Sequence, residues 1–129
     1  MKKRAYLSEF LGTLILLATV IGSGIMGETL SPENTAIALL GNTIATGAIL
    51  FVIITIFGPI SGAHFNPIVT ISFLINGDIS NRDSIMYMCV QILGAILGVW
   101  AAHLMFDLPI AQISSKSRSG LSQGFSEAI

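Results

Sequence analysis

The side chains that could do chemistry in this sequence are few, and apolar residues surround most of them. Glu9 lies just inside the first apolar segment, while His64 and Asn66 lie in the run SGAHFNP from Ser61 to Pro67. An ionisable side chain inside an apolar segment is costly, and by default it faces a protein interior or a water-filled cavity. For Glu9 a second interpretation stays open, in which the carboxylate still lies at the level of the lipid headgroups.

No enzyme or metal motif accompanies these residues. The sequence contains no HExxH, P-loop or GxSxG pattern. His64 and His103 are far apart and have no carboxylate at ligand spacing, and Cys89 is the single cysteine. One thiol can form neither an internal disulfide nor a cysteine cage for a metal. We therefore predict a protein that is not an enzyme and that has no cofactor and no metal.

Composition points to a lipid bilayer as the main solvent of the chain. Of its 129 residues, 53% are hydrophobic and 10% are charged, whereas a soluble domain carries about 25% charged residues. The formal net charge of −1 creates no basic field, which argues against a nucleic-acid partner.

Three segments are long enough to span a bilayer, which takes about 20 apolar residues; they cover about 6–26, 35–57 and 84–106. The charge-free run Phe10–Gly27 exceeds a signal-peptide core of about 7–15 residues, so the first segment is predicted to be a retained span. Gly94 with Gly98 and Ala18 with Gly22 have the spacing of small residues that lets helices approach closely in lipid. The alternative is that these small residues face the lipid.

A fourth apolar stretch, about 66–75, is too short to span and carries no charge. Asn66 is a good N-cap and Pro67 suits the first helical turn, so a short helix is predicted to start here. The preceding stretch, Gly58–Phe65, is predicted to be unsuited to regular helix. At membrane depth such backbone survives only when it is buried in protein or lines a watery cavity.

Charge bias and a weak internal echo suggest the orientation and the domain arrangement. Lys2, Lys3, Arg4 and Arg82 favour a cytoplasmic N-terminus in a multi-pass cell-membrane protein, although Lys116 and Arg118 oppose this bias. The segment 7–11 is echoed at 125–129, as in membrane proteins built from two inverted repeats. We predict a first repeat over 1–120 and the truncated start of a second repeat over 121–129.

With these features in order, the sequence resembles the major intrinsic proteins, the aquaporins and aquaglyceroporins. Ser61–Pro67 resembles the family's first Asn-Pro-Ala loop, Glu9–Thr13 its opening helix, and Gln91 with Gly94 a pair in its third span. The resemblance covers nearly the whole chain as the first half of a bacterial-type member. It implies an all-α membrane protein with three transmembrane helices, one re-entrant half-helix and the start of a fourth helix.

The resemblance also implies roles for residues along a pore. Asn66 would donate its amide to a passing water or solute, and Pro67 would start a half-helix whose positive end faces the pore centre. The acceptors would be the carbonyls of Gly62, Ala63, His64 and Phe65. Glu9, Gln91 and Glu127 would be structural within the membrane, and the assembly would be a homo-oligomer, a tetramer.

Two positions depart from the family pattern. Ile68 stands where alanine is usual, which adds bulk beside the Asn-Pro turn. Thr46 falls where water-selective members carry an aromatic filter residue, which implies a wider filter for glycerol- or arsenite-like solutes. The alternative for Thr46 is simple packing between helices.

Function is therefore predicted as a passive membrane channel for water and small neutral solutes. The sequence contains no second Asn-Pro and no arginine within a span, so this chain is interpreted as a half-channel fragment. Two alternatives remain: a secondary transporter coupled through Glu9, and an inactive fragment that needs a partner.

Overall fold

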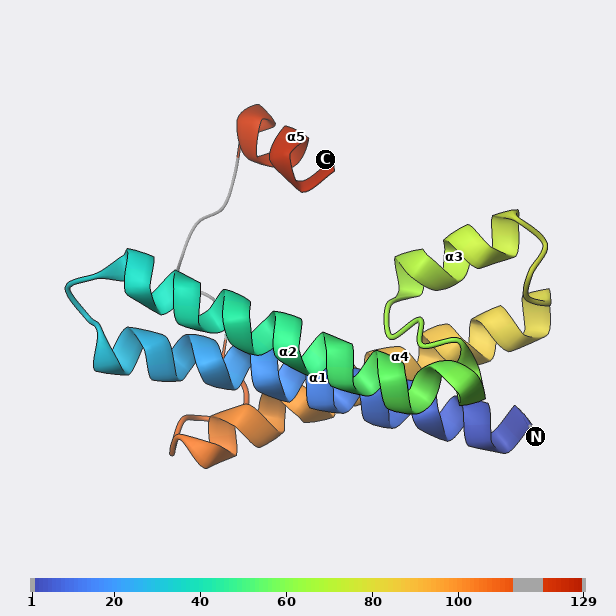
Figure 1. Cartoon of the computed structure of the whole chain (residues 1–129), viewed down its shortest axis with the longest axis horizontal. Coiled ribbons are helices and arrows are strands. Elements are labelled where there is room, and N and C mark those ends of the chain that lie inside the picture. The colour runs from blue at the N-terminus through green and yellow to red at the C-terminus, as the bar shows by residue number, and fades with distance from the viewer. Residues whose placement is uncertain (1, 113–119, 129) are drawn as a thin grey trace.

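The computed structural model describes residues 2–112 and 120–128, the last two without their side chains, and the regular structure in this part is entirely helical. The helices are α1 (Lys2–Leu30), α2 (Thr35–Ser61), α3 (Pro67–Ile75), α4 (Asn81–Met105) and α5 (Leu121–Ala128) (Figure 1).

Three of these helices, α1, α2 and α4, are long and apolar enough to cross a membrane, with 29, 27 and 25 residues. At about 1.5 Å per residue each exceeds the roughly 30 Å thickness of the hydrocarbon core. α3 has only 9 residues and cannot cross. The predicted fold class is therefore confirmed as an all-helical membrane protein, with three helices long enough to span and one short helix between the second and the third.

Two helices begin before the expected apolar spans because their first turns are polar. α1 already begins at Lys2. α4 begins at Asn81, where Ser80 caps the helix: its Oγ accepts from the Asp83 N–H at 3.2 Å and donates to the Asp83 carboxylate at 2.8 Å. The first of these bonds satisfies one of the backbone donors that a helix start leaves free.

The end of α2 corrects one prediction. The stretch Gly58–Phe65 was expected to be unsuited to regular helix, yet α2 continues through Pro59 to Ser61. Proline's fixed φ is compatible with helix, and what it removes is one backbone donor. The helix ends at Gly62, whose left-handed φ of 89° suits glycine and whose N–H donates to the Gly58 carbonyl at 2.9 Å. Between α2 and α3, irregular backbone is thus confined to residues 62–66.

α1 is the central helix, because it packs against both α2 and α4, while α3 packs against α4. α5 contacts none of the other four helices. In Figure 1 the chain leaves α2, turns inward, and returns along α3 to the end where α4 begins. The loop and α3 together therefore enter and leave at the same end of the structure, which is a re-entrant arrangement.

Glycines allow the close approach of α1 and α4. A methyl group added at Gly94 would meet the Phe10 carbonyl, and one added at Gly98 would meet the Leu14 carbonyl. Both glycines are buried. The interpretation that this pair faces lipid is therefore wrong, and the spacing serves helix packing.

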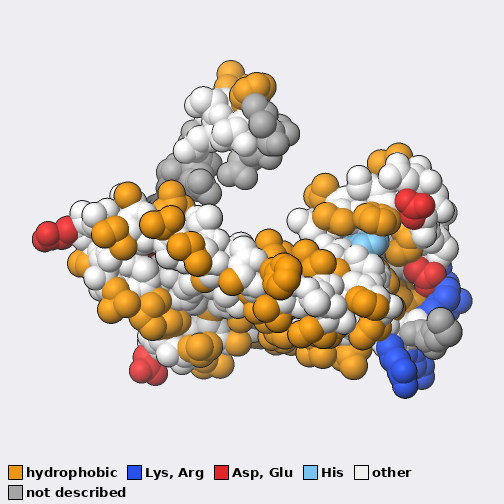
Figure 2. All heavy atoms as spheres, viewed as in Figure 1, with side chains coloured by type: hydrophobic (Ala, Val, Ile, Leu, Met, Phe, Trp, Pro, Cys, Tyr) orange, Lys and Arg blue, Asp and Glu red, His pale blue; other side chains and the backbone are white. Residues whose placement is uncertain are grey.

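The outer surface of the long helices is largely apolar, as Figure 2 shows along their length. Phe51, for example, is 74% exposed. Among the described residues, the basic side chains gather at the end that holds the N-terminus, where Lys2 donates to Asp83 at 2.7 Å. Apolar flanks with charges at the ends are what a bilayer requires of a helix bundle.

Candidate functional site

Glu9 is the centre of a buried hydrogen-bond network, with 0% of the residue exposed. Its Oε1 accepts from Ser61 Oγ at 2.6 Å and from the His64 N–H at 3.1 Å. Its Oε2 accepts from the Phe65 N–H at 2.7 Å and from Gln91 Nε2 at 2.8 Å. Every partner is a donor, so the carboxylate is fully used as an acceptor. A buried charge is tolerated when it is hydrogen-bonded in this way.

These donors come from different parts of the fold. Ser61 is the last residue of α2, His64 and Phe65 belong to the loop, and Gln91 lies on α4. Glu9 on α1 therefore joins the loop backbone to two other helices. The carboxylate therefore faces the protein interior.

A second layer of side chains completes the network. Thr70 on α3 is 0% exposed; its Oγ1 donates to the Asn66 carbonyl at 3.2 Å and accepts from Gln91 Nε2 at 3.0 Å. The Tyr87 hydroxyl donates to the Ser61 carbonyl at 2.8 Å. Within the described part, no buried side-chain nitrogen or oxygen lacks a partner. This complete satisfaction gives the site a single arrangement.

His64 and Phe65 anchor the loop by packing their rings inward. His64 Nδ1 lies 3.1 Å from Thr70 Oγ1, and its ring centroid lies 4.3 Å from that of Phe73. A methyl group added at Gly12 would overlap the Phe65 ring, so α1 needs glycine at this point. The two rings thereby hold the loop against α3 and α1.

The loop backbone has an unusual course. Ala63 and Phe65 have positive φ angles of 54° and 49°, and Gly62 has 89°. Left-handed backbone is uncommon for residues with a Cβ and costs about 1–2 kcal/mol each. The two N–H bonds to Glu9 hold this course. Among the described residues, no hydrogen bond uses the main-chain oxygens of 62–65, so four successive carbonyls keep their acceptor capacity.

Asn66 sits where this loop becomes α3. Its backbone is extended, with φ −150°, and its Oδ1 accepts from the Ile68 N–H at 2.8 Å. A side-chain oxygen must be the acceptor in that bond, so the amide NH₂ points away from the helix. The residue is exposed, and no described residue hydrogen-bonds to Nδ2. Pro67 follows as the first helical residue.

The remaining predicted site residues lie outside the network. Ile68 is 70% exposed. Thr46 is half-buried on α2 and donates to Asn42 Oδ1 at 3.4 Å. Glu127 lies in α5, and its side chain is outside the described residues.

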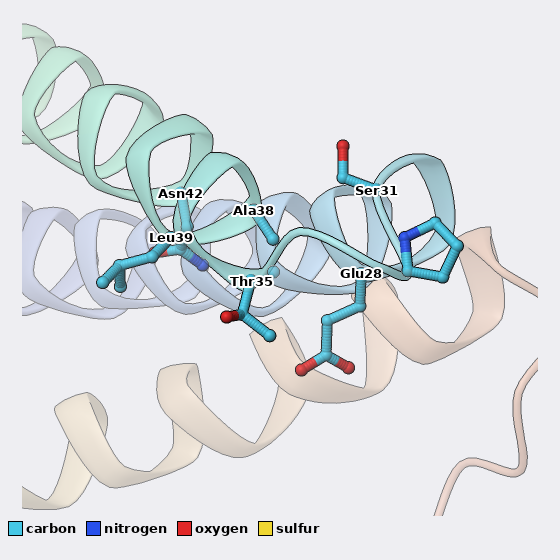
Figure 3. A pocket seen from close by; sticks show the side chains of 8 residues that line it. Glu28, Ser31, Thr35, Ala38, Leu39 and Asn42 are labelled. Carbon is cyan, nitrogen blue, oxygen red and sulfur yellow. The ribbon is translucent and has the colours of Figure 1, made fainter.

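A cavity of about 500 Å³ lies between the end of α1 and the start of α2, bordered by polar side chains of Glu28, Ser31, Thr35 and Asn42 (Figure 3). Asn42 connects this cavity to Thr46, one turn further along α2. Asn42 also donates from Nδ2 to the Val20 carbonyl on α1 at 2.9 Å.

Sequence reasoning assigned no role to Ser61, Thr70, Tyr87 or Asn42. A signal existed for α4, since its buried residues recur at spacings of three and four and include a tyrosine and a glutamine among small residues. Thr70 and Asn42 carry no such signal, because one polar residue in an apolar helix has several possible partners.

Comparisons with known proteins agree with this geometry. Residues 1–127 match the Major intrinsic protein family. The chain is 51% identical over 126 residues to Aquaglyceroporin AqpS of Rhizobium meliloti (strain 1021), which covers 98% of this chain and 54% of that protein. It is 35% identical over 129 residues to Probable aquaporin PIP2-5 of Arabidopsis thaliana, covering 95% of this chain and 45% of that protein. It is 30% identical over 123 residues to Aquaporin-2 of Ovis aries, covering 91% of this chain and 44% of that protein. The chain thus spans about half the length of these curated relatives.

Proposed function

Because the chain belongs to the major intrinsic protein family of membrane channels, we propose that it forms one half of a passive channel for water and small neutral solutes. The observation that carries this proposal is the turn at Asn66, where a free amide donor follows four carbonyls with unused acceptor capacity. Such a row can exchange hydrogen bonds with a solute that has shed its water shell.

The charge properties of the turn favour neutral solutes. α3 begins at Pro67 and directs its positive dipole end toward Asn66. The carbonyls of residues 62–65 could attract a cation. The positive end of α3 follows them along the chain, and it repels a cation. Channels use positive half-helix ends in this way to exclude cations and protons. Ile68 next to Asn66 would narrow the path on one side.

Thr46 supports a solute larger than water. It is a short side chain with a hydroxyl that faces a cavity-lining residue, Asn42. One relative with 51% identity is named an aquaglyceroporin. We therefore propose glycerol- or arsenite-like neutral solutes for the complete channel, with Thr46 in the solute path.

We propose that Glu9 and Gln91 are structural and do not carry protons, and that Glu127 has the equivalent role in a second repeat. Four donors hydrogen-bond to the Glu9 carboxylate. A coupling proton that bound there would displace one of them and weaken the bonds that hold the loop. This argues against the transporter alternative.

The same family membership supports three further proposals. Residues 1–120 form a first repeat and residues 121–129 begin a second. The N-terminus is cytoplasmic in a cell membrane, since Lys2, Lys3, Arg4 and Arg82 lie at the end where α1 and α4 begin. The complete channel is a homo-oligomer, a tetramer.

The test is solute flux in proteoliposomes, with this chain alone and with the chain fused to the second half of the Rhizobium meliloti relative. Stopped-flow light scattering should show flux of glycerol without a proton or sodium gradient. Asn66→Ala should lower that flux, whereas Asn76→Ala, at the exposed far end of α3, is the matched control. Flux that requires an ion gradient would refute the channel proposal.

A further inference from the structure

Asn42 on α2 hydrogen-bonds to α1 and borders the cavity between the two helices. Its Nδ2 donates to the Val20 carbonyl on α1 at 2.9 Å. A methyl group added at Gly24 would lie 3.0 Å from this Nδ2, so the glycine provides the space for the amide. Figure 3 shows the Asn42 side chain bordering the cavity between the two helices.

The direction of this amide is chemically determined. A carbonyl can only accept, so the group on Val20 must face the NH₂ of Asn42 and Oδ1 must face the other way. Oδ1 is likewise only an acceptor. The Thr46 hydroxyl, 3.4 Å away, therefore points its proton at Oδ1.

Thr46 differs in this respect from its neighbours on α2. Thr43 and Thr55 donate to the carbonyl four residues earlier, at 2.8 and 2.7 Å, which is the usual bond of a threonine inside a helix. A hydroxyl has one proton and two lone pairs. Thr46 donates instead to the Asn42 side chain, so its hydroxyl oxygen is held in a different position from those of Thr43 and Thr55. In that position its proton is engaged, and it can only accept a hydrogen bond from a passing solute.

We propose that Asn42 is a positioning residue that sets solute selectivity by holding the Thr46 hydroxyl as a hydrogen-bond acceptor, so that the channel favours neutral solutes with several O–H donors. The proposal rests on the proposed function, in which Thr46 lies in the solute path. A solute that donates to Thr46 recovers a bond lost with its hydration shell, and a solute without that donor does not. One net hydrogen bond corresponds to about a three- to tenfold difference in permeability.

Two isomers of the same atomic composition make the test sharp. Propane-1,3-diol has two O–H groups and 2-methoxyethanol has one. Their permeabilities are measured in the same proteoliposomes, with flux through protein-free liposomes subtracted. In the proteoliposomes described above, we expect the diol to permeate faster than the ether when Thr46 and Asn42 are unchanged. Thr46→Val should reduce the diol-to-ether permeability ratio about three- to tenfold.

Gly24→Ala and Asn42→Leu then test Asn42 itself. Gly24→Ala presses on the Asn42 amide without altering either Asn42 or Thr46. The Thr46 hydroxyl should then rotate to donate to the main-chain carbonyl of Asn42, which moves its oxygen away from the present position. Each variant should reduce the permeability ratio as Thr46→Val does, and Asn42→Leu combined with Thr46→Val should reduce it no further, since the two residues act as one unit. Gly41→Ala is the matched control, because nothing described lies within 4 Å of the added methyl.

The outcomes separate the two levels of the proposal. If Thr46→Val leaves the ratio unchanged, the placement of Thr46 in the solute path is wrong. If Thr46→Val lowers the ratio while Gly24→Ala and Asn42→Leu do not, the path stands and the role of Asn42 is refuted. Equal loss of both permeabilities in Gly24→Ala and Asn42→Leu would show that Asn42 only supports folding, which also refutes the proposal.

Discussion

Gln91 on α4 donates a 2.8 Å hydrogen bond to the Glu9 carboxylate on α1, and both residues are 0% exposed. The bond joins positions 82 residues apart in the chain. The same carboxylate also accepts two backbone N–H groups of the loop. The shape of the loop, and with it the position of Asn66, therefore depends on a side chain in the first helix.

Glu9→Gln should destabilise the folded protein strongly. The amide has the same size, but its NH₂ would face one of the present donors and leave it unpaired. Unpaired buried donors cost about 1–3 kcal/mol each, and a broken buried charge network costs about 3–5 kcal/mol. Thermal unfolding in detergent should show a clearly lower midpoint, with all solute fluxes reduced together.

Glu33→Gln is the control for this substitution, because Glu33 is exposed in the turn before α2. Its midpoint should match that of the native protein. A Glu9→Gln protein that folds normally and loses only proton-dependent uptake would instead favour the transporter alternative.

Gly98→Ala should separate α1 from α4. The added methyl would meet the Leu14 carbonyl, which is backbone and cannot move aside, and overpacking of this kind costs about 1–3 kcal/mol. Fluorescence of Trp100, the single tryptophan and a neighbour on α4, can follow the change during unfolding. Gly47→Ala adds a methyl with nothing described within 4 Å and should be neutral or slightly stabilising; equal effects of both variants would contradict the packing role.

Asn66→Asp and Asn66→Ala separate the two uses of one side chain. Aspartate keeps the acceptor for the Ile68 N–H but loses the amide donor, so stability should hold while flux of water and glycerol falls. Alanine loses both, and the missing cap should cost about 0.5–2 kcal/mol. Stopped-flow flux and thermal unfolding measure the two effects separately, and unchanged flux in Asn66→Asp would remove the amide from the solute path.

Labelling of engineered cysteines tests the orientation. In a Cys89→Ser background, Lys3→Cys and Glu33→Cys place thiols at opposite ends of α1 and α2. A membrane-impermeant maleimide should label position 33 in intact cells and position 3 only after permeabilisation, because basic ends stay in the cytoplasm. The reverse pattern would overturn the proposed orientation.

The sequence by itself determined the features that depend on neighbouring residues. Hydropathy over about 20 residues identified the three spans, and an N-cap followed by proline located α3 at Asn66 and Pro67. The family resemblance rested on motifs of the same local kind, above all Ser61–Pro67. Helix ends were less well determined. α1 and α4 begin before the expected spans, and α2 continues past Pro59, which can lie within the last turns of a helix.

The tertiary structure decided what each polar or small residue contacts. The hydrogen-bond partners of Glu9 were open, Gly98 could have faced lipid, and Asn42 had no distinguishing pattern at all. Their partners lie on other helices, and the rotation of one helix against another is set by side-chain packing rather than by local sequence. For that reason the elements of this protein were readable from its sequence, while the hydrogen-bond network that shapes the turn at Asn66 was not.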